Sequence, residues 1–316
     1  MPPRTNPATR RSRRSCLVFV AILTTGTWAH AATLTVGPGQ TYAAPSAAAK
    51  AARPGDTVKI EPGTYRDCAV WRANRLTIEG TGPGVVLADK ICQGKAIFVV
   101  HANDVTVRRL TFRGARSVDG NGAGIRAEGV NLTLDDLKFI DNEDGVLAGS
   151  KHDSAIVVRN SEFVHNGACI KACAHGIYVG HIKLLQIVNS HFFDNQVGHH
   201  IKSRAARTVL TDNHIEDGPN GTASYEVDIP NGGTLIMTGN VIEKGPRNQN
   251  PTAAVTLGEE GVSQATPKIL IKDNHFTNDG PPTAFVRNLT KTPAQLIGNT
   301  LDGNAVTPLI GPGSVH

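Results

Sequence analysis

The sequence has few aromatic residues and no long apolar run, and both shortages exclude classes of protein. Aromatic residues make up 5% of the 316 residues and charged residues 19%, whereas 40% are hydrophobic. The chain is therefore too polar for a multi-span membrane protein and too apolar to be disordered. Its 33 glycines and 18 prolines indicate many turns, and the length suits one large all-β domain.

Acidic residues are also missing from the start of the chain, where none precedes Asp56. Five of the 32 basic residues lie in the first fourteen positions, so 32 minus 5 leaves 27 basic against 27 acidic residues. The net charge of +5 therefore belongs to this leader and not to a binding face. This distribution argues against nucleic-acid binding. The five residues are Arg4, Arg10, Arg11, Arg13 and Arg14.

The leader has the pattern of an export signal. Its basic stretch is followed by the apolar run 17–23 and by Ala29-His30-Ala31, a small-x-small cleavage site. We predict a signal peptide over residues 1–31, cleavage near Ala31, and a single mature domain over residues 32–316 that is periplasmic or secreted. The run is too short for a transmembrane anchor. Residues 12–14 loosely match a twin-arginine signal, which leaves that route open.

Four cysteines remain after the leader, and an even number in an exported chain favours disulfides. Cys169 and Cys173 share a Gly/Ala-rich loop, so we predict that they pair with each other and that Cys68 pairs with Cys92. A Cys/His metal site is the alternative, although the spacing fits no zinc signature.

A phrase of about 25 residues recurs from residue 105 onward, and it determines the predicted fold. Each copy has β-branched residues, a polar residue, an apolar anchor, and then Asn, Asp or Gly. Apolar residues alternate with period two, which is typical of strands. The anchors are Phe112, Phe139, Phe163, Phe192, Ile215, Ile242, Phe276 and Leu301.

Each copy also contains a second short strand. Short strands with Asn/Gly corners predict an all-β fold, a single-stranded right-handed parallel β-helix (a solenoid) in which like positions stack. The anchors would form an interior column and the recurring asparagines would satisfy corner backbone groups. These asparagines are Asn160, Asn189, Asn213, Asn240, Asn274 and Asn299.

The N-terminal part reads as a cap. Residues 45–52 predict a short helix that ends at Pro54-Gly55 and covers the open end of the solenoid. The phrase AAKAARPGDTVKIEPGTY (residues 48–65), together with the later copies, resembles the right-handed parallel β-helix proteins of the pectate-lyase-like superfamily. The resemblance covers residues 33–310. It implies exported proteins that mostly cleave or epimerise acidic polysaccharides, with some hydrolases, adhesins and tailspikes.

Aligning the second strands gives one inward and two outward columns. The inward column is Ile125, Val146, Ile177, Ile201, Val227 and Val255. The outward column after it is Arg126, Leu147, Tyr178, Lys202, Asp228 and Thr256, and the one before it is Gly124, Gly145, Gly176, His200, Glu226 and Ala254. This alignment predicts one solvent-facing patch of Tyr178, His200, Lys202, Glu226 and Asp228, with Arg204 beside it.

Extra residues fall just before these strands, where long loops on one edge can wall a site. They lie at 114–123, 167–174, 218–223 and 245–252. We expect His175, His199, Tyr225 and the Cys169–Cys173 loop on this rim as substrate-binding elements. The glycine column would leave a groove in which a sugar ring approaches the backbone.

These groups suit β-elimination at a uronic acid. Lys202 could act as the base where the cations Arg204 and protonated His200 favour its uncharged form. Arg204 could instead clamp the uronate carboxylate. Tyr178 or His200 could be the acid, and Glu226 with Asp228 could hold Ca²⁺ or bind sugar hydroxyls.

A narrower resemblance supports Lys202. Residues 200–215, HIKSRAARTVLTDNHI, resemble a rung of the β-helix lyase family that contains chondroitinase B and alginate lyases. The resemblance implies that Lys202 is the base, assisted by an arginine on the next coil. Asp228 or Pro230 stands at that position here, so Arg204 would take the assisting role.

The sequence therefore predicts an exported enzyme, a polysaccharide lyase or C5-epimerase whose partner is an anionic polysaccharide. Two alternatives stay open. One is glycoside hydrolysis with Glu226 and Asp228 as acid and base. The other is a non-catalytic glycan-binding or envelope solenoid, in which the charged residues form surface ion pairs.

Overall fold

The computed structural model describes residues 1–4 and 31–316. The predicted signal peptide lies almost entirely outside the described residues, so it stays a prediction. Among the described residues, no helix is both long enough and apolar enough to span a membrane.

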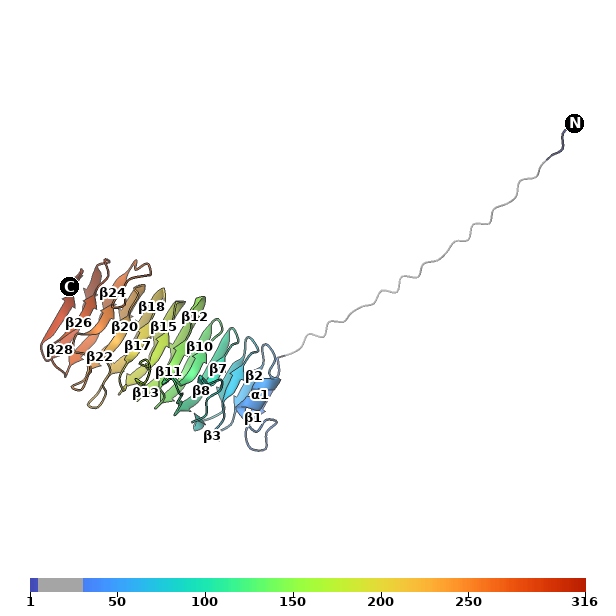
Figure 1. Cartoon of the computed structure of the whole chain (residues 1–316), viewed down its shortest axis with the longest axis horizontal. Helices are drawn as coiled ribbons and strands as arrows, with labels where there is room; N and C mark the ends of the chain where they lie inside the picture. Colours follow the sequence, from blue (N-terminus) through green and yellow to red (C-terminus); the bar gives the residue numbers. More distant parts are fainter. Residues whose placement is uncertain (5–30) are drawn as a thin grey trace. The chain divides into compact units, whose positions relative to one another are not determined.

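Residues 31–316 form a parallel β-solenoid, as the recurring phrase predicts (Figure 1). Its strands pair only with strands one coil away, in parallel register, and belong to two sheets of 20 and 10 strands. The larger sheet contains β1 (Thr33–Val36), β2 (Thr57–Ile60), β3 (Gly63–Tyr65), β5 (Thr77–Gly80), β6 (Val85–Ala88), β8 (Val105–Arg113), β10 (Leu132–Ile140), β12 (Lys151–Arg159), β13 (Glu162–Val164), β15 (Ile182–Val188), β16 (His191–Phe193), β18 (Arg207–Thr211), β19 (His214–Glu216), β21 (Thr234–Thr238), β22 (Val241–Lys244), β24 (Ile269–Lys272), β25 (His275–Asn278), β27 (Ala294–Ile297), β28 (Thr300–Gly303) and β30 (Gly313–Val315). The smaller sheet contains β4 (Ala69–Trp71), β7 (Ala96–Val100), β9 (Ala123–Ala127), β11 (Asp144–Ala148), β14 (Ile177–Val179), β17 (His199–Ser203), β20 (Tyr225–Ile229), β23 (Ala253–Leu257), β26 (Thr283–Asn288) and β29 (Val306–Ile310).

The predicted interior column is confirmed along the larger sheet. All eight anchors, from Phe112 to Leu301, are register partners of one another from coil to coil. The Phe163 and Phe192 rings stack with centroids 4.3 Å apart, and the Phe139 and Phe163 rings with centroids 4.7 Å apart. Stacked aromatic rings of this kind bury large apolar areas and stabilise neighbouring coils against each other.

Four of the six recurring asparagines have the structural role that the sequence predicts. For Asn160 and Asn189 the prediction is wrong, because both are exposed and Ser161 and Ser190 take the ladder positions beside them. Asn213, Asn240, Asn274 and Asn299 form a ladder in which each amide nitrogen donates to the next amide oxygen, at 2.8–2.9 Å. The same side chains satisfy corner backbone groups: Asn213 Nδ2 donates to the carbonyl oxygen of Ile187 at 3.0 Å. The ladder therefore fixes the coil corners and leaves these residues unavailable for chemistry.

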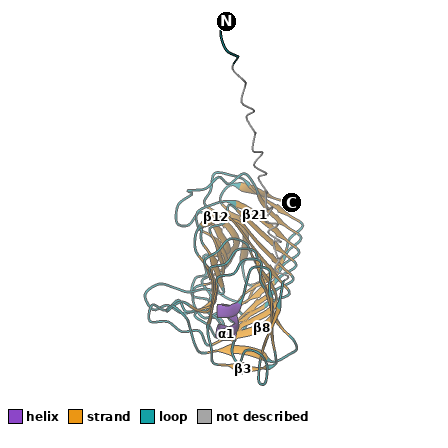
Figure 2. Cartoon of the chain, turned by 90° about the vertical axis from the view of Figure 1, so that its right-hand side faces the viewer, coloured by secondary structure: helices purple, strands orange, loops and turns teal. Residues whose placement is uncertain are grey.

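The capping helix and both disulfides are also confirmed. Helix α1 (Pro45–Ala51) packs against β1 and β4 at the start of the solenoid, with Ala48 fully buried (Figure 2). Cys68 is bonded to Cys92 and Cys169 to Cys173. The alternative Cys/His metal site is therefore excluded, because these sulfurs are held in disulfides.

Candidate active-site groove

The outward column after the inward one is confirmed. Tyr178 of β14 is the register partner of Lys202 of β17, which in turn is the partner of Asp228 of β20. Adjacent coils lie about 4.8 Å apart, so these three side chains are vertical neighbours on one face. Tyr178 and Lys202 line a groove of about 460 Å³ together with Arg204, His175, His199 and the end of the Cys169–Cys173 loop. Asp228 is 2% exposed and lies buried against Lys202, so the prediction that it faces solvent is wrong.

The outward column before it is wrong. His200 and Glu226 are 1% and 0% exposed and face the interior, next to the core residue Ile201. Strict alternation would place His200 opposite Ile201. Instead, both are buried, while His199 and Lys202 on either side face the groove. Alternation therefore breaks at the start of β17, and His200 cannot act as an acid on a substrate in the groove.

The proposed glycine-lined sugar groove is wrong for the same reason. A Cβ atom on Gly145 would lie 2.8 Å from the Phe163 ring, and one on Gly176 would lie 3.3 Å from the Phe192 ring. These glycines thus make room for core aromatic rings and not for a ligand. His200 and Glu226 occur in the coils whose anchors are Ile215 and Ile242, so the larger inward side chains coincide with smaller anchors.

His200 and Glu226 belong to a buried ionic cluster. His200 Nε2 lies 3.1 Å from Asp217 Oδ1, and Lys244 Nζ lies 3.2 Å from Glu226 Oε1. Lys244 also donates to the carbonyl oxygen of Ser224 at 2.9 Å. Both side chains of the Lys244–Glu226 pair are fully buried, and Glu226 Oε2 has no partner among the described residues. Burial, only partly opposed by Lys244, raises the pKa of Glu226 well above its usual value.

The predicted pairing of Glu226 with Asp228 is also wrong, because Glu226 faces the interior and Asp228 the groove. The two cannot share a Ca²⁺ ion or flank a glycosidic bond as the acid and base of a hydrolase. His200, Asp217 and Glu226 place ligand atoms within 4.8 Å of one another. The set does not fit Ca²⁺, which prefers about six to eight oxygen ligands, and the Lys244 ammonium already neutralises Glu226.

Lys202 lies on the floor of the groove, with a side chain 11% exposed, between two carboxylates. Its Nζ is 3.2 Å from Asp228 Oδ2 and 2.7 Å from Glu260 Oε1. Lys202 Nζ therefore bridges two carboxylates. Burial, opposed mainly by Lys202, raises the pKa of Asp228 to about 6.

Arg204 joins this group, as predicted, and connects it to Tyr178. Its Nε donates to the Tyr178 phenol oxygen at 2.9 Å, and the guanidinium carbon lies 5.7 Å from the Tyr178 ring centroid. Its Nη2 is 2.5 Å from Glu260 Oε2, and its Nη1 donates to Asn231 Oδ1. A guanidinium donor on a phenol oxygen stabilises negative charge on that oxygen.

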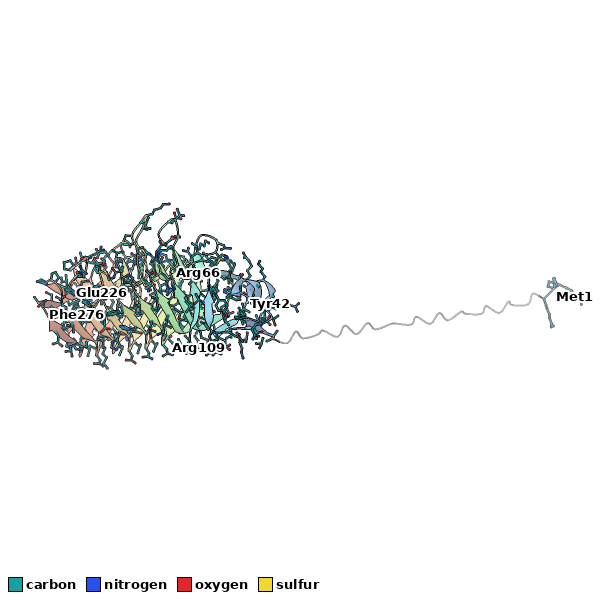
Figure 3. The ribbon with its side chains drawn as sticks, turned by 90° about the horizontal axis from the view of Figure 1, so that it is seen from below. Met1, Tyr42, Arg66, Arg109, Glu226 and Phe276 are labelled. Atoms are coloured by element: carbon teal, nitrogen blue, oxygen red, sulfur yellow. A yellow bond between two sulfur atoms is a disulfide. The ribbon has the colours of Figure 1, made fainter. Side chains whose placement is uncertain are left out.

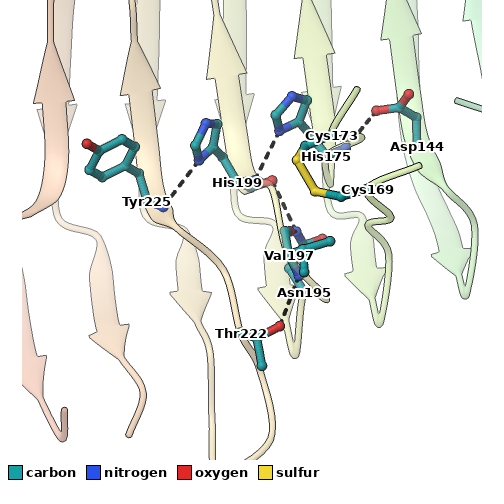
Figure 4. Close-up of a disulfide and its surroundings, with 9 residues drawn as sticks. All are labelled: Asp144, Cys169, Cys173, His175, Asn195, Val197, His199, Thr222 and Tyr225. Atoms are coloured by element: carbon teal, nitrogen blue, oxygen red, sulfur yellow. Dashed lines mark hydrogen bonds between the residues drawn. A yellow bond between two sulfur atoms is a disulfide. The ribbon is translucent and has the colours of Figure 1, made fainter. Parts of the chain in front are cut away.

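The predicted rim residues form a stacked row along the groove (Figure 4). The His175 and His199 rings are 4.8 Å apart, and the Tyr225 ring is 5.2 Å from His199. The backbone N–H of His199 donates to His175 Nδ1 at 3.0 Å, and that of Tyr225 donates to His199 Nδ1 at 3.2 Å. The Nδ1 atoms are therefore acceptors, so neutral rings carry their proton on Nε2.

These histidines are neutral at ordinary pH. Burial, followed by the charge of Lys202, lowers the pKa of His199 to about 3, and burial lowers that of His175 well below its usual value. His199 Nε2 lies 3.4 Å from Asp228 Oδ2. The protonated nitrogen of His199 therefore faces the same carboxylate oxygen as Lys202, and the row holds Asp228 in place.

The sequence reasoning missed Glu260, Glu259 and Arg287. Glu260 follows β23 and reaches Lys202 from 58 residues away in the sequence. Glu259 Oε2 accepts from Arg287 Nη1 at 2.8 Å. The pair of acids stands in the phrase Gly-Glu-Glu-Gly at 258–261, in a loop after the aligned strand. The predicted rim loops all precede that strand, so this signal was not used.

These observations define a class of protein: a parallel β-solenoid with a groove on its smaller sheet that is lined by ionisable side chains. Residues 149–313 match the family model described as right handed beta helix region, and the chain belongs to this family. No curated protein matches the sequence.

Solved structures share the architecture. An alginate lyase from Paenibacillus sp. str. FPU-7 superposes with a TM-score of 0.61 at 18% identity, over 88% of this chain and 99% of that one. The A-module of the mannuronan C-5 epimerase AlgE6 from Azotobacter vinelandii gives 0.44 at 16% identity, over 86% and 92%. The pectin methylesterase PemA from Erwinia chrysanthemi gives 0.47 at 11% identity, over 79% of each chain. At 18% identity the likeness to the Paenibacillus enzyme shows the fold alone.

Proposed function

We propose that this protein is a carbohydrate-active enzyme that cleaves an acidic polysaccharide by β-elimination at a uronic acid residue. The observation that carries the proposal is the contact of Tyr178 with Arg204 beside Lys202 in one open groove. The Paenibacillus alginate lyase, which shares the fold along nearly its whole length, supports the same substrate class.

The proposal gives a role to each of three side chains. Arg204 stabilises negative charge on the Tyr178 oxygen, so Tyr178 suits the base. Lys202, which contacts both Asp228 and Glu260, suits the acid and, with Arg204, faces the uronate carboxylate. These roles reverse the sequence-based expectation that Lys202 is the base, because that expectation did not include two carboxylates at Lys202.

The proposed step is a β-elimination that breaks the bond between C4 and O4 of the uronic acid. The Tyr178 phenolate takes the C5 proton, and the C5–H electron pair becomes the second bond between C4 and C5. The C4–O4 bond breaks, and O4 receives a proton from the Lys202 ammonium. Tyr178 and Lys202 return to their starting forms when a proton passes from the phenol to the amine through water. C5-epimerisation would share the first half of this step.

The test is incubation of the mature protein with alginate, pectate and glycosaminoglycans while absorbance at 232 nm is followed. We expect an unsaturated product, and loss of about 10²–10⁴-fold in turnover for Tyr178→Phe and Lys202→Ala. Tyr42→Phe, near the N-terminal cap, is the matched control and should keep full turnover.

Other products would contradict the lyase proposal. Reducing ends without absorbance would indicate hydrolysis, and a changed C5 configuration in the polymer without absorbance would indicate epimerisation. Binding without any product would indicate the non-catalytic solenoid. Full turnover in Tyr178→Phe would remove the assigned base.

We also propose that the protein is exported after cleavage near Ala31, to the periplasm or the outside of the cell. The two disulfides support this proposal, because such bonds persist mainly in oxidising compartments. N-terminal sequencing of the protein recovered from cell fractions tests it, and a chain that begins at Met1 in the cytoplasm would refute it.

A further inference from the structure

The loop that follows β23 carries two adjacent acids, Glu259 and Glu260, each of which contacts a cation of the smaller sheet. It is bounded by Gly258 and Gly261, with φ angles of +83° and +89° that favour glycine. Its backbone is fixed to the neighbouring coil: Gly258 N–H donates to the carbonyl oxygen of Ile229 at 2.9 Å and Glu260 N–H to that of Pro230 at 3.0 Å. The side chains of the two acids are thus presented from an anchored turn.

Glu260 bridges the two cations of the proposed active site. One of its oxygens contacts Lys202 Nζ at 2.7 Å, and the other contacts Arg204 Nη2 at 2.5 Å. The Glu260 side chain is 42% exposed, whereas that of Asp228, the other acid at Lys202, is 3% exposed. Asp228 is therefore a fixed part of the groove floor, and Glu260 is an exchangeable occupant of its open side.

Glu259 makes the equivalent contact further along the smaller sheet. Its Oε2 accepts from Arg287 Nη1 at 2.8 Å and from Thr256 Oγ1 at 3.1 Å. Thr256 and Arg287 continue the column of Lys202 and Asp228, so Lys202 and Arg287 are three coils, or about 14 Å, apart between Cα atoms. Two consecutive acids of one loop therefore neutralise two separate cationic positions.

From this arrangement we infer that Glu259 and Glu260 occupy two carboxylate-binding subsites, which a polyuronate must take over when it binds. The inference rests on the proposed function. A polyuronate carries one carboxylate per sugar, the same functional group that the loop places on Lys202, Arg204 and Arg287. Exchange replaces one carboxylate by another at each cation, so the charge pairing of Lys202, Arg204 and Arg287 is kept. The loop is thus an internal competitor that weakens binding of short or uncharged glycans.

The test compares binding in a background that does not turn over substrate. Hexamers of mannuronate and of galacturonate are titrated calorimetrically into the full mature chain carrying Tyr178→Phe, with and without Glu260→Gln. We expect Glu260→Gln to tighten binding of at least one hexamer about tenfold, because the competing charge is removed. Glu259→Gln should tighten hexamer binding less and leave dimer binding unchanged.

The matched control is Glu162→Gln, an exposed acid that pairs with Lys138 away from the groove and should leave affinity unchanged. Equal or weaker binding by Glu260→Gln, or no binding by either variant, would overturn the inference. The outcome is separable from that of the lyase assay. Tighter binding without cleavage by the Tyr178-containing enzyme supports the subsites and refutes the lyase, whereas cleavage with unchanged affinity does the reverse.

Discussion

Replacing Lys244 by methionine should destabilise the solenoid strongly, although Lys244 is fully buried and does not line the groove. Methionine has a similar volume, so the packing is largely kept while the ammonium is lost. Glu226 would then have neither of its oxygens paired, since Oε2 has no partner in the described structure (Glu226 is labelled in Figure 3). Breaking a fully buried ion pair from one side costs about 3–5 kcal/mol, and we expect a loss of that size at pH 7.

The penalty should depend on pH in a defined direction. Burial raises the pKa of Glu226 above its usual value, and loss of Lys244 removes an opposing influence. Between the unfolded and folded pKa values the folded state holds a proton that the unfolded state has released, so stability falls as pH rises. The Lys244→Met penalty should therefore shrink as pH is lowered toward the unfolded pKa of glutamic acid.

The assay is unfolding in guanidinium chloride followed by circular dichroism. The double variant Glu226→Gln/Lys244→Met should recover most of the loss, because no buried charge remains. Lys138→Met, which removes an exposed partner of Glu162, should change stability by less than about 0.5 kcal/mol. A Lys244→Met protein within about 1 kcal/mol of the wild type would refute the reasoning.

Two further predictions concern the groove. The pKa of Asp228 is about 6, and protonated Asp228 binds Lys202 less well, so kcat/KM should fall as the pH drops through that value. In Asp228→Asn, activity should be low and this acidic limb of the pH–rate profile should be absent. An unchanged acidic limb in the variant would contradict the assignment. Removing the Cys68–Cys92 disulfide should lower the free energy of unfolding by about 3 kcal/mol, measured by thermal unfolding, and leave KM unchanged. Removing the Cys169–Cys173 disulfide, which lines the groove, should raise KM. Equal effects of the two removals on KM would refute this distinction.

The fold could be predicted because the same residue pattern recurs in every coil of a solenoid. Each coil places an anchor at the same position, so eight anchors from Phe112 to Leu301 give the same register independently. Parallel stacking then follows from the repeat length, and the corner asparagines mark where each coil bends. A single irregular coil does not disturb such a prediction.

The site could be predicted only where strands alternate regularly. Tyr178, Lys202 and Asp228 follow the alternation, although Asp228 is buried against Lys202 and does not face solvent. His200 and Glu226 lie where the chain bends and two successive residues face inward. Glu260 reaches Lys202 from a loop two coils further on, and loops carry no periodicity that would reveal such a contact. The strand register therefore predicted the residues on the floor of the groove but not the loop residue Glu260 on its open side.

The pairing of cations with acids on and beside the smaller sheet has a consequence for how a polymer arrives. Arg126 and Lys95 both contact Glu128, Arg287 contacts Glu259, and Lys202 with Arg204 contacts Glu260. A surface neutralised at this short range projects little field beyond the Debye length of about 8 Å in physiological salt. Encounter with a polyanion should therefore be governed by diffusion and local collision instead of by long-range electrostatic steering. The association rate should depend only weakly on ionic strength.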